Sequence, residues 1–416
     1  MEFVKGVNLH FIPTSKYKTN RIKIRFSAPM SKDTISGRVL VASMLETANR
    51  VYPTSQSFRE HLANLYGADF TTNVFRRGLV HCVDIDLSFV RDIFLSRKYS
   101  LVDELLDFLH AALFYPLVEG EGFEQATFDI EKKNLLLDLE AENENPYYYA
   151  HQELNKLFYE QQEMKLPRLS EIDLVAQETS ISSFAIFQKM MLEDQIDIFF
   201  MGDFKKEELL TKMQKFSFQE RTVNLYLQYR QPFSNVLKEG FDTKEINQSI
   251  LELGYHFPVQ YGEEAHMPLM ILNGLLGGFA HSKLFANVRE KECLAYTITS
   301  QMDIFSGFLR IYAGINRNQR TKALTLINRQ IIDIKRGKFS DEDLEQTKSM
   351  LKNALFLSYD RQITLLEDAY MAENFGKKFL TLKSRLNSID SVNKMNIMEV
   401  AKDIKLQAIY FLEGKG

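Results

Sequence analysis

Cysteine is scarce in this chain of 416 residues, and long apolar runs are absent from it. Only Cys82 and Cys293 are present, far apart and outside any Cys-x-x-Cys arrangement, which argues against a disulfide framework and against a thiolate zinc site. We expect two reduced and mostly buried thiols. No segment reaches the roughly 18 apolar residues of a membrane span, and residues 1–20 lack the apolar run of a signal peptide. We therefore expect a cytoplasmic protein without a membrane partner.

Charge of one sign is not concentrated in any block either. The formal net charge is −4, the sequence pI is near 6.1, and Lys and Arg are spread along the chain. This distribution argues against a surface for nucleic acid or anionic lipid, so peptides or proteins are the expected partners. The length is too great for one core and indicates two domains or more.

An internal repeat is the most informative pattern that is present. Three pairs of segments match in the same order: 57–73 with 284–300, 128–146 with 344–362, and 196–204 with 408–416. The first pair is typical of a polar helix followed by an alternating strand, the second of a long amphipathic helix, and the third of an apolar strand. Ser340 and Asp343 are expected to begin the second of the long helices as a variant capping box.

The repeat predicts two copies of one α+β unit. We expect an N-terminal domain over 1–218, a packed linker over 219–241 and a C-terminal domain over 242–416. The linker is rich in Tyr, Leu and Phe and poor in Gly and Ser, which favours packing over flexibility. Alternating strands such as 21–28 and 308–315 predict a mostly antiparallel sheet in each domain, with one face covered by helices.

Three segments together resemble the pitrilysin or insulinase-like zinc peptidases, the peptidase M16 family. They are NLYGADFTTNV at 64–74, the acidic helix that ends in ENENP at 142–146, and LLGGFAHSKLFANVREKECLAY at 275–296. The resemblance covers essentially the whole chain, including the duplication, and the smaller bacterial and mitochondrial-processing-type members are nearest in length. It implies a bilobed chain that forms half of a clam shell.

In that family a helical His-x-x-Glu-His motif supplies two zinc ligands and a general base. Histidines at i and i+4 point at one ion, and the glutamate reaches the metal-bound water. The resemblance places this motif on SMLET at 43–47, where Ser43 and Thr47 stand in place of the histidines and Glu46 remains. Hydroxyl groups are poor ligands for zinc. We expect no metal here, and Glu46 is either a base without a metal or a solvated helix residue.

The third zinc ligand of the family comes from a later helix. Its distance from Pro146 places it on Asp138, with Glu140 as the alternative register. His61 ends the segment SFREH at 57–61, which has the glutamate and the second histidine of the motif but serine at its first position. We expect His61 to be a surface or capping residue. The other histidines form no pair at ligand spacing on one predicted element, so no replacement metal site is visible.

The second half keeps an arginine and a tyrosine, Arg289 and Tyr296. Family members use this pair to bind the peptide backbone and to stabilise the oxyanion of the tetrahedral intermediate. A guanidinium and a phenol can stabilise that charge in a cavity shielded from water. Gly274, Gly277 and Gly278 would let a peptide or a neighbouring loop approach the backbone, or else they end a helix and form a turn.

The resemblance leads to three hypotheses. In the first, the chain is the zinc-lacking subunit of a heterodimeric peptidase, inactive alone, and a related partner carries the intact motif and the zinc. In the second, it is a non-catalytic peptide-binding or scaffold protein of the same fold. In the third, it is a metallopeptidase by itself, with other ligands. The missing histidines beside the retained Arg289 and Tyr296 favour the first.

Overall fold

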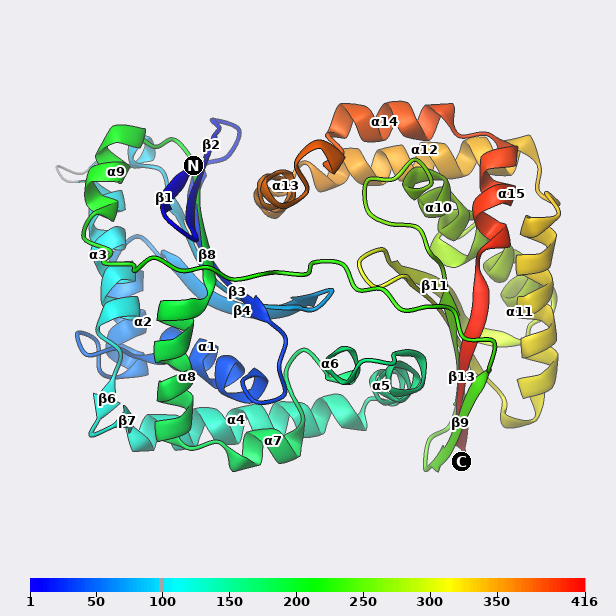
Figure 1. Ribbon diagram of the computed structural model, residues 1–416, viewed down its shortest axis with the longest axis horizontal. Coiled ribbons are helices and arrows are strands. Elements are labelled where there is room, and N and C mark those ends of the chain that lie inside the picture. Colours follow the sequence, from blue (N-terminus) through cyan, green and yellow to red (C-terminus); the bar gives the residue numbers. More distant parts are fainter. Residues whose placement is uncertain (97–99, 416) are drawn as a thin grey trace. The chain divides into compact units, whose positions relative to one another are not determined.

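The computed structural model describes residues 1–96 and 100–415, which form two compact units. Unit 1 consists of residues 1–141 and 166–227, and unit 2 consists of residues 142–165 and 228–416. Each unit contains one mostly antiparallel sheet with helices packed on it (Figure 1). The predicted α+β fold with two related halves is therefore confirmed. Gly416, which ends the predicted C-terminal domain, lies outside the described residues.

The sheet of unit 1 has the strand order β1-β2-β8-β3-β5-β4, and only β2 and β8 pair in parallel. Its strands are β1 (Glu2–Val4), β2 (Val7–Pro13), β3 (Thr19–Pro29), β4 (Asp69–Arg77), β5 (Val80–Val90) and β8 (Gln195–Gly202). β3 alternates as predicted, because Ile22, Ile24 and Phe26 enter the hydrophobic core. On the other face, Nε of Arg25 donates a hydrogen bond to Asp84 of β5 at 2.7 Å.

The helices of unit 1 contribute the rest of its core. They are α1 (Ile35–Thr47), α2 (Ser55–Asn64), α3 (Leu101–Phe114), α4 (Gln125–Glu144), α7 (Ile172–Gln177), α8 (Ser180–Glu193) and α9 (Lys206–Met213), with the short helix η1 (Asp92–Phe94) and the hairpin of β6 (Val118–Glu119) and β7 (Gly122–Phe123). α1 is buried over most of its length. A Cβ atom on Gly37 of α1 would lie 2.2 Å from Cδ1 of Ile186 in α8. This glycine therefore lets the two helices pack closely.

The sheet of unit 2 has the strand order β11-β12-β10-β13-β9, and only β13 and β9 pair in parallel. Its strands are β9 (Lys238–Lys244), β10 (Ser249–His256), β11 (Ala295–Asp303), β12 (Phe308–Ile315) and β13 (Lys405–Gly414). Along β10, Leu251, Leu253 and Tyr255 enter the core of the unit. Glu252 between them pairs with Arg310 of β12, whose Nε donates to it at 2.7 Å.

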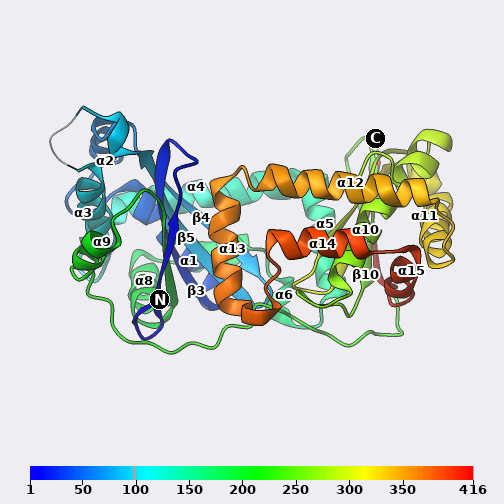
Figure 2. The same cartoon turned by 90° about the horizontal axis from the view of Figure 1, so that it is seen from above.

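The helices of unit 2 are α5 (Pro146–Phe158), α6 (Gln162–Lys165), α10 (His266–Asn273), η2 (Gly274–Gly278), η3 (Phe285–Lys291), η4 (Arg317–Gln319), α11 (Arg320–Lys335), α12 (Asp341–Ser358), α13 (Gln362–Phe375), η5 (Gly376–Lys378), α14 (Leu382–Ser391) and α15 (Lys394–Lys402). α12 begins with the predicted capping box, in which the hydroxyl of Ser340 accepts from the N–H of Asp343 at 3.0 Å. α14 runs along α12 (Figure 2), and Nζ of Lys352 donates to Asp390 at 2.7 Å. None of the described helices is long and apolar enough to cross a membrane.

The two strand orders confirm the internal repeat. Read from one edge, β4-β5-β3-β8-β2 in unit 1 corresponds to β11-β12-β10-β13-β9 in unit 2, with the single parallel pair at the same place. The segments that match in sequence occupy corresponding elements, since 57–73 and 284–300 lead into β4 and β11, while 196–202 lies in β8 and 408–414 lies in β13. The duplication is therefore one of topology as well as of sequence.

One segment lies in a different unit from the one its sequence position suggests. Residues 142–165 fall inside the predicted domain of 1–218 but belong to unit 2. The reason is the apolar face of α5, because Leu154 and Phe158 pack over Gly254 of β10. A Cβ atom on that glycine would meet the Phe158 ring at 3.0 Å, so its absence makes room for the helix.

The segment between the halves also differs in extent from the predicted linker of 219–241. β9 already begins at Lys238, so the last residues of the predicted linker form part of the second sheet. Before it, Leu227 and Tyr229 are buried. The hydroxyl of Tyr229 donates to the side chain of Gln231 at 2.9 Å. Tyr229 and Gln231 belong to unit 2, whereas Leu227 is the last residue of unit 1.

Candidate functional site

The SMLET segment forms the last turns of α1, where the helix emerges from the core. Ser43, Glu46 and Thr47 are partly exposed, whereas the two residues between the first and the second are buried. The positions at i and i+4 therefore lie on one face, as the predicted motif requires. The helix ends at Thr47 because Ala48 is extended, with φ −161° and ψ 161°.

Thr47 meets a carboxylate of α4. Its hydroxyl donates a hydrogen bond to Oε1 of Glu131 at 2.9 Å. The same hydroxyl lies 2.9 Å from the carbonyl oxygen of Ser43. The carboxylate that α4 brings to the motif is therefore Glu131, which corrects the prediction of Asp138 and its alternative, Glu140. Both of those side chains are exposed, and Asp138 lies about two helical turns beyond Glu131.

Glu46 is held by β4 and α2. Its Oε2 accepts hydrogen bonds from the backbone N–H of Thr72 at 2.7 Å and from the Thr72 hydroxyl at 2.8 Å. Its Oε1 accepts from the guanidinium of Arg59 at 3.1 Å. Glu46 is thus neither a solvated helix residue nor a base with a free carboxylate. It ties the end of α1 to the edge strand β4.

The donor set at this place does not fit zinc. Two of the positions offer hydroxyl groups, which bind zinc poorly, and Glu46 already accepts three hydrogen bonds. Among the residues that the structure describes, no three His, Cys, Asp or Glu side chains are grouped as they would be around a metal ion. The nearby His61 stacks on Tyr52, with ring centroids 4.4 Å apart, and burial lowers its pKa.

In unit 2, Arg289 lies near the end of η3 and Tyr296 lies in β11, at the places that the sequence predicts. The Arg289 guanidinium lies over the ring of Phe285, 4.7 Å from its centroid, and 3.7 Å from the carboxylate of Glu290. Tyr296 is 66% exposed. Both polar groups therefore face solvent in this chain.

The backbone presents Tyr296 by means of a β-bulge. Ala295 pairs with Ile315 and Thr297 pairs with Gly314, so two residues of β11 occupy the space of one on β12. A bulge turns a side chain away from the regular alternation and is common beside functional sites. Because β11 is the edge strand of its sheet, the exposed Tyr296 stands at a rim.

Two of the three predicted glycines are packed against the chain itself. A Cβ atom on Gly274 would lie 2.7 Å from Thr347, and one on Gly277 would lie 2.7 Å from the backbone nitrogen of Ser300. Gly278 is less crowded, with its nearest neighbour at 3.2 Å. The close approach at Gly274 and Gly277 is thus made by neighbouring segments of the chain.

Thr72 and Thr299, which correspond in the two repeats, both donate their hydroxyl groups to residues of a preceding helix. The sequence match of 57–73 with 284–300 sets Thr72 against Thr299. The hydroxyl of Thr72 donates to the carboxylate of Glu46, whereas the hydroxyl of Thr299 donates to the carbonyl oxygen of Gly277 at 2.9 Å. A carboxylate side chain accepts this bond in the first repeat, and a main-chain carbonyl oxygen accepts it in the second.

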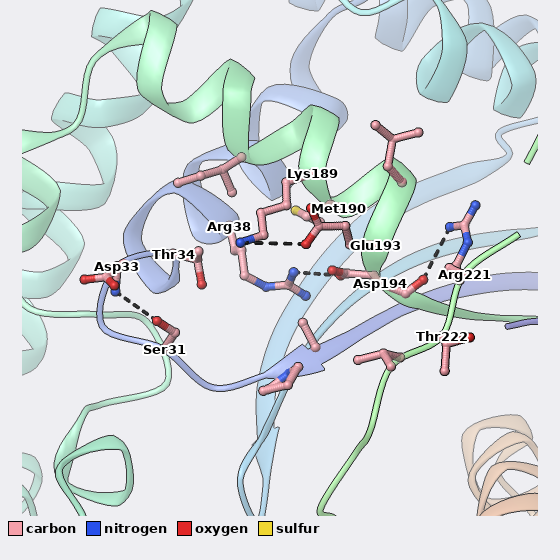
Figure 3. A pocket seen from close by; sticks show the side chains of 15 residues that line it. Ser31, Asp33, Thr34, Arg38, Lys189, Met190, Glu193, Asp194, Arg221 and Thr222 are labelled. Carbon is pink, nitrogen blue, oxygen red and sulfur yellow. Dashed lines mark hydrogen bonds and ion pairs between the residues drawn. The ribbon is translucent and has the colours of Figure 1, made fainter. Parts of the chain in front are cut away.

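The sequence analysis missed a cavity of about 560 Å³ in unit 1, shown in Figure 3. At its base, Arg38 of α1 donates to Asp194 at 2.6 Å, and both side chains are almost fully buried. Arg221 approaches from the segment after α9 and donates to the main-chain carbonyl of Asp194 at 3.3 Å. The signal available in the sequence was one arginine in the otherwise apolar start of α1.

Buried His81 completes this network. Nε of Arg38 donates to Nδ1 of His81 at 3.1 Å, so Nε2 carries the proton and donates to the carbonyl oxygen of Arg168 at 3.0 Å. Burial, with the Arg38 charge as a second cause, lowers the pKa of His81 to about 3. All polar groups of the Arg38 side chain have partners within the chain, so the network serves the packing of α1.

The two thiols differ from each other. Cys82 is buried, and its burial raises its pKa to about 11. Cys293 is exposed and has a left-handed backbone with φ 48°. The expectation of burial is therefore correct for Cys82 and wrong for Cys293, which lies in the turn between η3 and β11.

The chain is similar to several known proteins. Residues 184–351 match the family described as the peptidase M16 inactive domain. The solved structure of a conserved protein from Enterococcus faecalis V583 superposes with a TM-score of 0.97 at 39% identity and covers 100% of this chain and 98% of its own. A probable inactive metalloprotease of Bacillus subtilis, YmfF, is 28% identical over 98% of this chain and 96% of its own length. A peptidase M16 inactive domain from Pseudomonas fluorescens shares the fold, with a TM-score of 0.81 at 14% identity over 99% of this chain and 97% of its own.

Proposed function

Because the chain belongs to the peptidase M16 family, as a member that lacks the zinc motif, we propose that it is the non-metal subunit of a two-chain zinc peptidase. A related chain with an intact His-x-x-Glu-His motif would hold the zinc. This chain would supply Arg289 and Tyr296 to the peptide in the shared cavity, and it would be inactive alone.

The contrast between the two halves carries this proposal. At the motif of the first half, Thr47 and Glu46 use their polar groups on Glu131 and Thr72. In the second half, Arg289 and Tyr296 are exposed, although burial of an aromatic ring would stabilise the fold. The proposal needs this exposure, because a peptide held by a second chain must be able to reach both side chains.

The chemistry of the exposed pair suits peptide cleavage. The scissile carbonyl oxygen gains negative charge as the tetrahedral intermediate forms, and fixed donors at that oxygen lower the barrier. The Arg289 guanidinium keeps its charge at any physiological pH, and the phenol of Tyr296 adds a neutral donor. A cavity closed by two related chains would exclude water and strengthen both interactions.

A direct test is to tag the chain in its native cell, purify it gently and identify by mass spectrometry what accompanies it in near one-to-one amount. We expect a related chain that contains His-x-x-Glu-His. The pair should cleave short unfolded peptides, whereas this chain alone should not. Cleavage by the chain alone, with zinc in stoichiometric amount, would contradict the proposal.

The alternative is a non-catalytic peptide-binding or scaffold protein of the same fold. It predicts that no accompanying chain carries the motif, and that every accompanying chain together cleaves no peptide. Retained peptide binding under those conditions would replace the first proposal with this one. Assay of the complete purified assembly therefore distinguishes the two.

A further inference from the structure

Unit 1 contains a second cavity, which has fewer charged residues in its lining than the one at Arg38. This groove has a volume of about 610 Å³ and lies between α8, the end of α3 and residues 217–219. Six of the apolar side chains that line it are Phe114, Val118, Phe184, Phe187, Met191 and Phe218. The volume falls within the range of about 300–1,000 Å³ that small ligands occupy in proteins.

The groove has one charged residue, Arg50, at its wall. No acidic side chain occurs among the described residues that line it. Arg50 is exposed, and its guanidinium makes no hydrogen bond or ion pair with the part of the chain that the structure describes; only its backbone N–H donates, to Tyr115 at 2.8 Å. The cavity at Arg38, by comparison, pairs its arginine with Asp194. An occupant of the groove therefore meets an apolar wall and one unneutralised positive charge.

Neutral polar groups complete the lining. Gln188 lies on the same helix as Phe187, and its amide makes no hydrogen bond within the part of the chain that the structure describes. Ser217 and Gln219 lie beside Phe218, where the Ser217 hydroxyl donates to the carbonyl oxygen of Lys215 at 3.5 Å and the Gln219 amide donates to that of Ser217 at 3.4 Å. Amide and hydroxyl groups can hydrogen-bond to the amides of a peptide backbone. A fatty acyl chain would offer no hydrogen-bond partner to the Gln188 amide, whereas a peptide backbone would. The lining thus favours a peptide over a lipid.

We propose that this groove binds the C-terminal end of a short apolar peptide, with the terminal carboxylate at Arg50. The apolar side chains of the peptide lie against the phenylalanines, and the Gln188 amide hydrogen-bonds to its backbone. The groove belongs to unit 1, whereas Arg289 and Tyr296 belong to unit 2. The site is therefore independent of the proposed peptidase role and needs no second subunit.

The full chain contains no tryptophan, so the fluorescence of a tryptophan-containing peptide reports binding without background. The probe is the tripeptide Leu-Ala-Trp with a free carboxylate, compared with the same peptide as its C-terminal amide. We expect the acid to bind about five- to tenfold more tightly than the amide, since a charge-assisted hydrogen bond is lost in the amide. Equal affinity of the two forms, or no binding of either at about 1 mM, would overturn the proposal.

Two variants with matched controls locate the site. Arg50→Gln should abolish the preference for the acid, whereas Arg336→Gln, at an exposed arginine at the end of α11, should keep it. Gln188→Glu places a negative charge in the groove wall and should weaken the acid more than the amide, whereas Gln177→Glu on α7 should not. Gln188 and Gln177 are both exposed, so neither substitution should disturb folding. A preference that survives Arg50→Gln would place the carboxylate elsewhere.

Competition with decanoate separates a peptide from a fatty acid. We expect decanoate to displace Leu-Ala-Trp only at concentrations well above the Kd of the peptide, because it cannot hydrogen-bond to the Gln188 amide as a peptide backbone can. Displacement by decanoate at lower concentrations than by unlabelled Leu-Ala-Phe would assign the groove to fatty acids and overturn the peptide assignment. Because none of these measurements involves cleavage, their failure leaves the proposed peptidase role untouched.

Discussion

The carboxylate of Glu46 accepts two hydrogen bonds from Thr72, one from the backbone N–H at 2.7 Å and one from the hydroxyl at 2.8 Å. In a zinc peptidase the corresponding glutamate would be needed as a base. Here it satisfies a donor on the edge strand β4 and fixes the end of α1. The degenerate motif has thereby become part of the framework of unit 1.

Replacement of Glu46 should consequently lower stability. Glu46→Ala removes the acceptor of the Thr72 N–H and hydroxyl, and we expect a loss of about 1–2 kcal/mol in the free energy of unfolding, since the site is partly exposed. Urea unfolding measures the change. Glu220→Ala, at an exposed glutamate, is the matched control and should change stability by less than about 0.5 kcal/mol. A Glu46→Ala variant as stable as its control would mean that the contact contributes nothing.

Restoring the histidines should restore a zinc site. In Ser43→His/Thr47→His, two imidazoles at i and i+4 lie beside Glu131, which together make a His₂Glu ligand set. We expect the native chain to bind no stoichiometric zinc and the double variant to bind about one zinc per chain, measured by metal analysis and by competition with a chromophoric chelator.

Further substitutions in the Ser43→His/Thr47→His variant test which residue of α4 acts as the third zinc ligand. Adding Glu131→Gln should reduce zinc affinity at least about tenfold. Adding Asp138→Asn should leave it unchanged, because that carboxylate is exposed further along the helix. The reverse result would reinstate the register predicted from the sequence.

The glycines of the second half allow a test of packing. Gly277→Ala places a methyl group 2.7 Å from the nitrogen of Ser300, and we expect a loss of about 1–3 kcal/mol from overpacking. Gly278→Ala, whose nearest neighbour lies at 3.2 Å, should cost less than about 0.5 kcal/mol. Chemical denaturation compares the two. Equal stability of both variants would show that Gly277 faces open space.

Buried His81 should make the fold sensitive to acid. Its folded-state pKa is about 3, below the usual 6.5, so the unfolded chain binds more protons between these values. This contribution to stability is present above pH 6.5 and is lost as the pH falls, by about 3 kcal/mol at pH 4. His266, whose pKa burial lowers to about 4, acts in the same direction.

The variant His81→Gln isolates this term. Glutamine keeps an acceptor for Arg38 and a donor for the Arg168 carbonyl but does not titrate. The free energy of unfolding should therefore fall less steeply between pH 6.5 and pH 4 than in the native chain. Parallel pH profiles for the two proteins would show that His81 does not titrate on unfolding.

Patterns among neighbouring residues correctly predicted the strands and helices cited here and the internal repeat. The alternation in 21–28 became β3, and the match of 57–73 with 284–300 became corresponding edge strands. Hydrophobic period and turn residues are properties of neighbouring positions, so a sequence displays them directly.

Features that depend on distant contacts could not be obtained in this way. The register of α4 against α1 depends on how two helices pack, so the sequence predicts Asp138 where the structure brings Glu131 to Thr47. The membership of α5 in unit 2 depends on the complementarity of Phe158 and Gly254. The unpaired charge at Arg50 became visible only once the groove around it was known.

Turnover by the assembled pair measures most directly whether this chain takes part in peptide cleavage. Arg289→Ala should leave assembly intact, because the side chain is exposed, and should lower kcat about 100-fold or more, as expected when a donor to the oxyanion is lost. Lys291→Ala, a neighbouring exposed cation on η3, should leave kcat within about twofold. If the Arg289→Ala pair cleaves peptide as fast as the native pair, this chain does not supply the oxyanion donor.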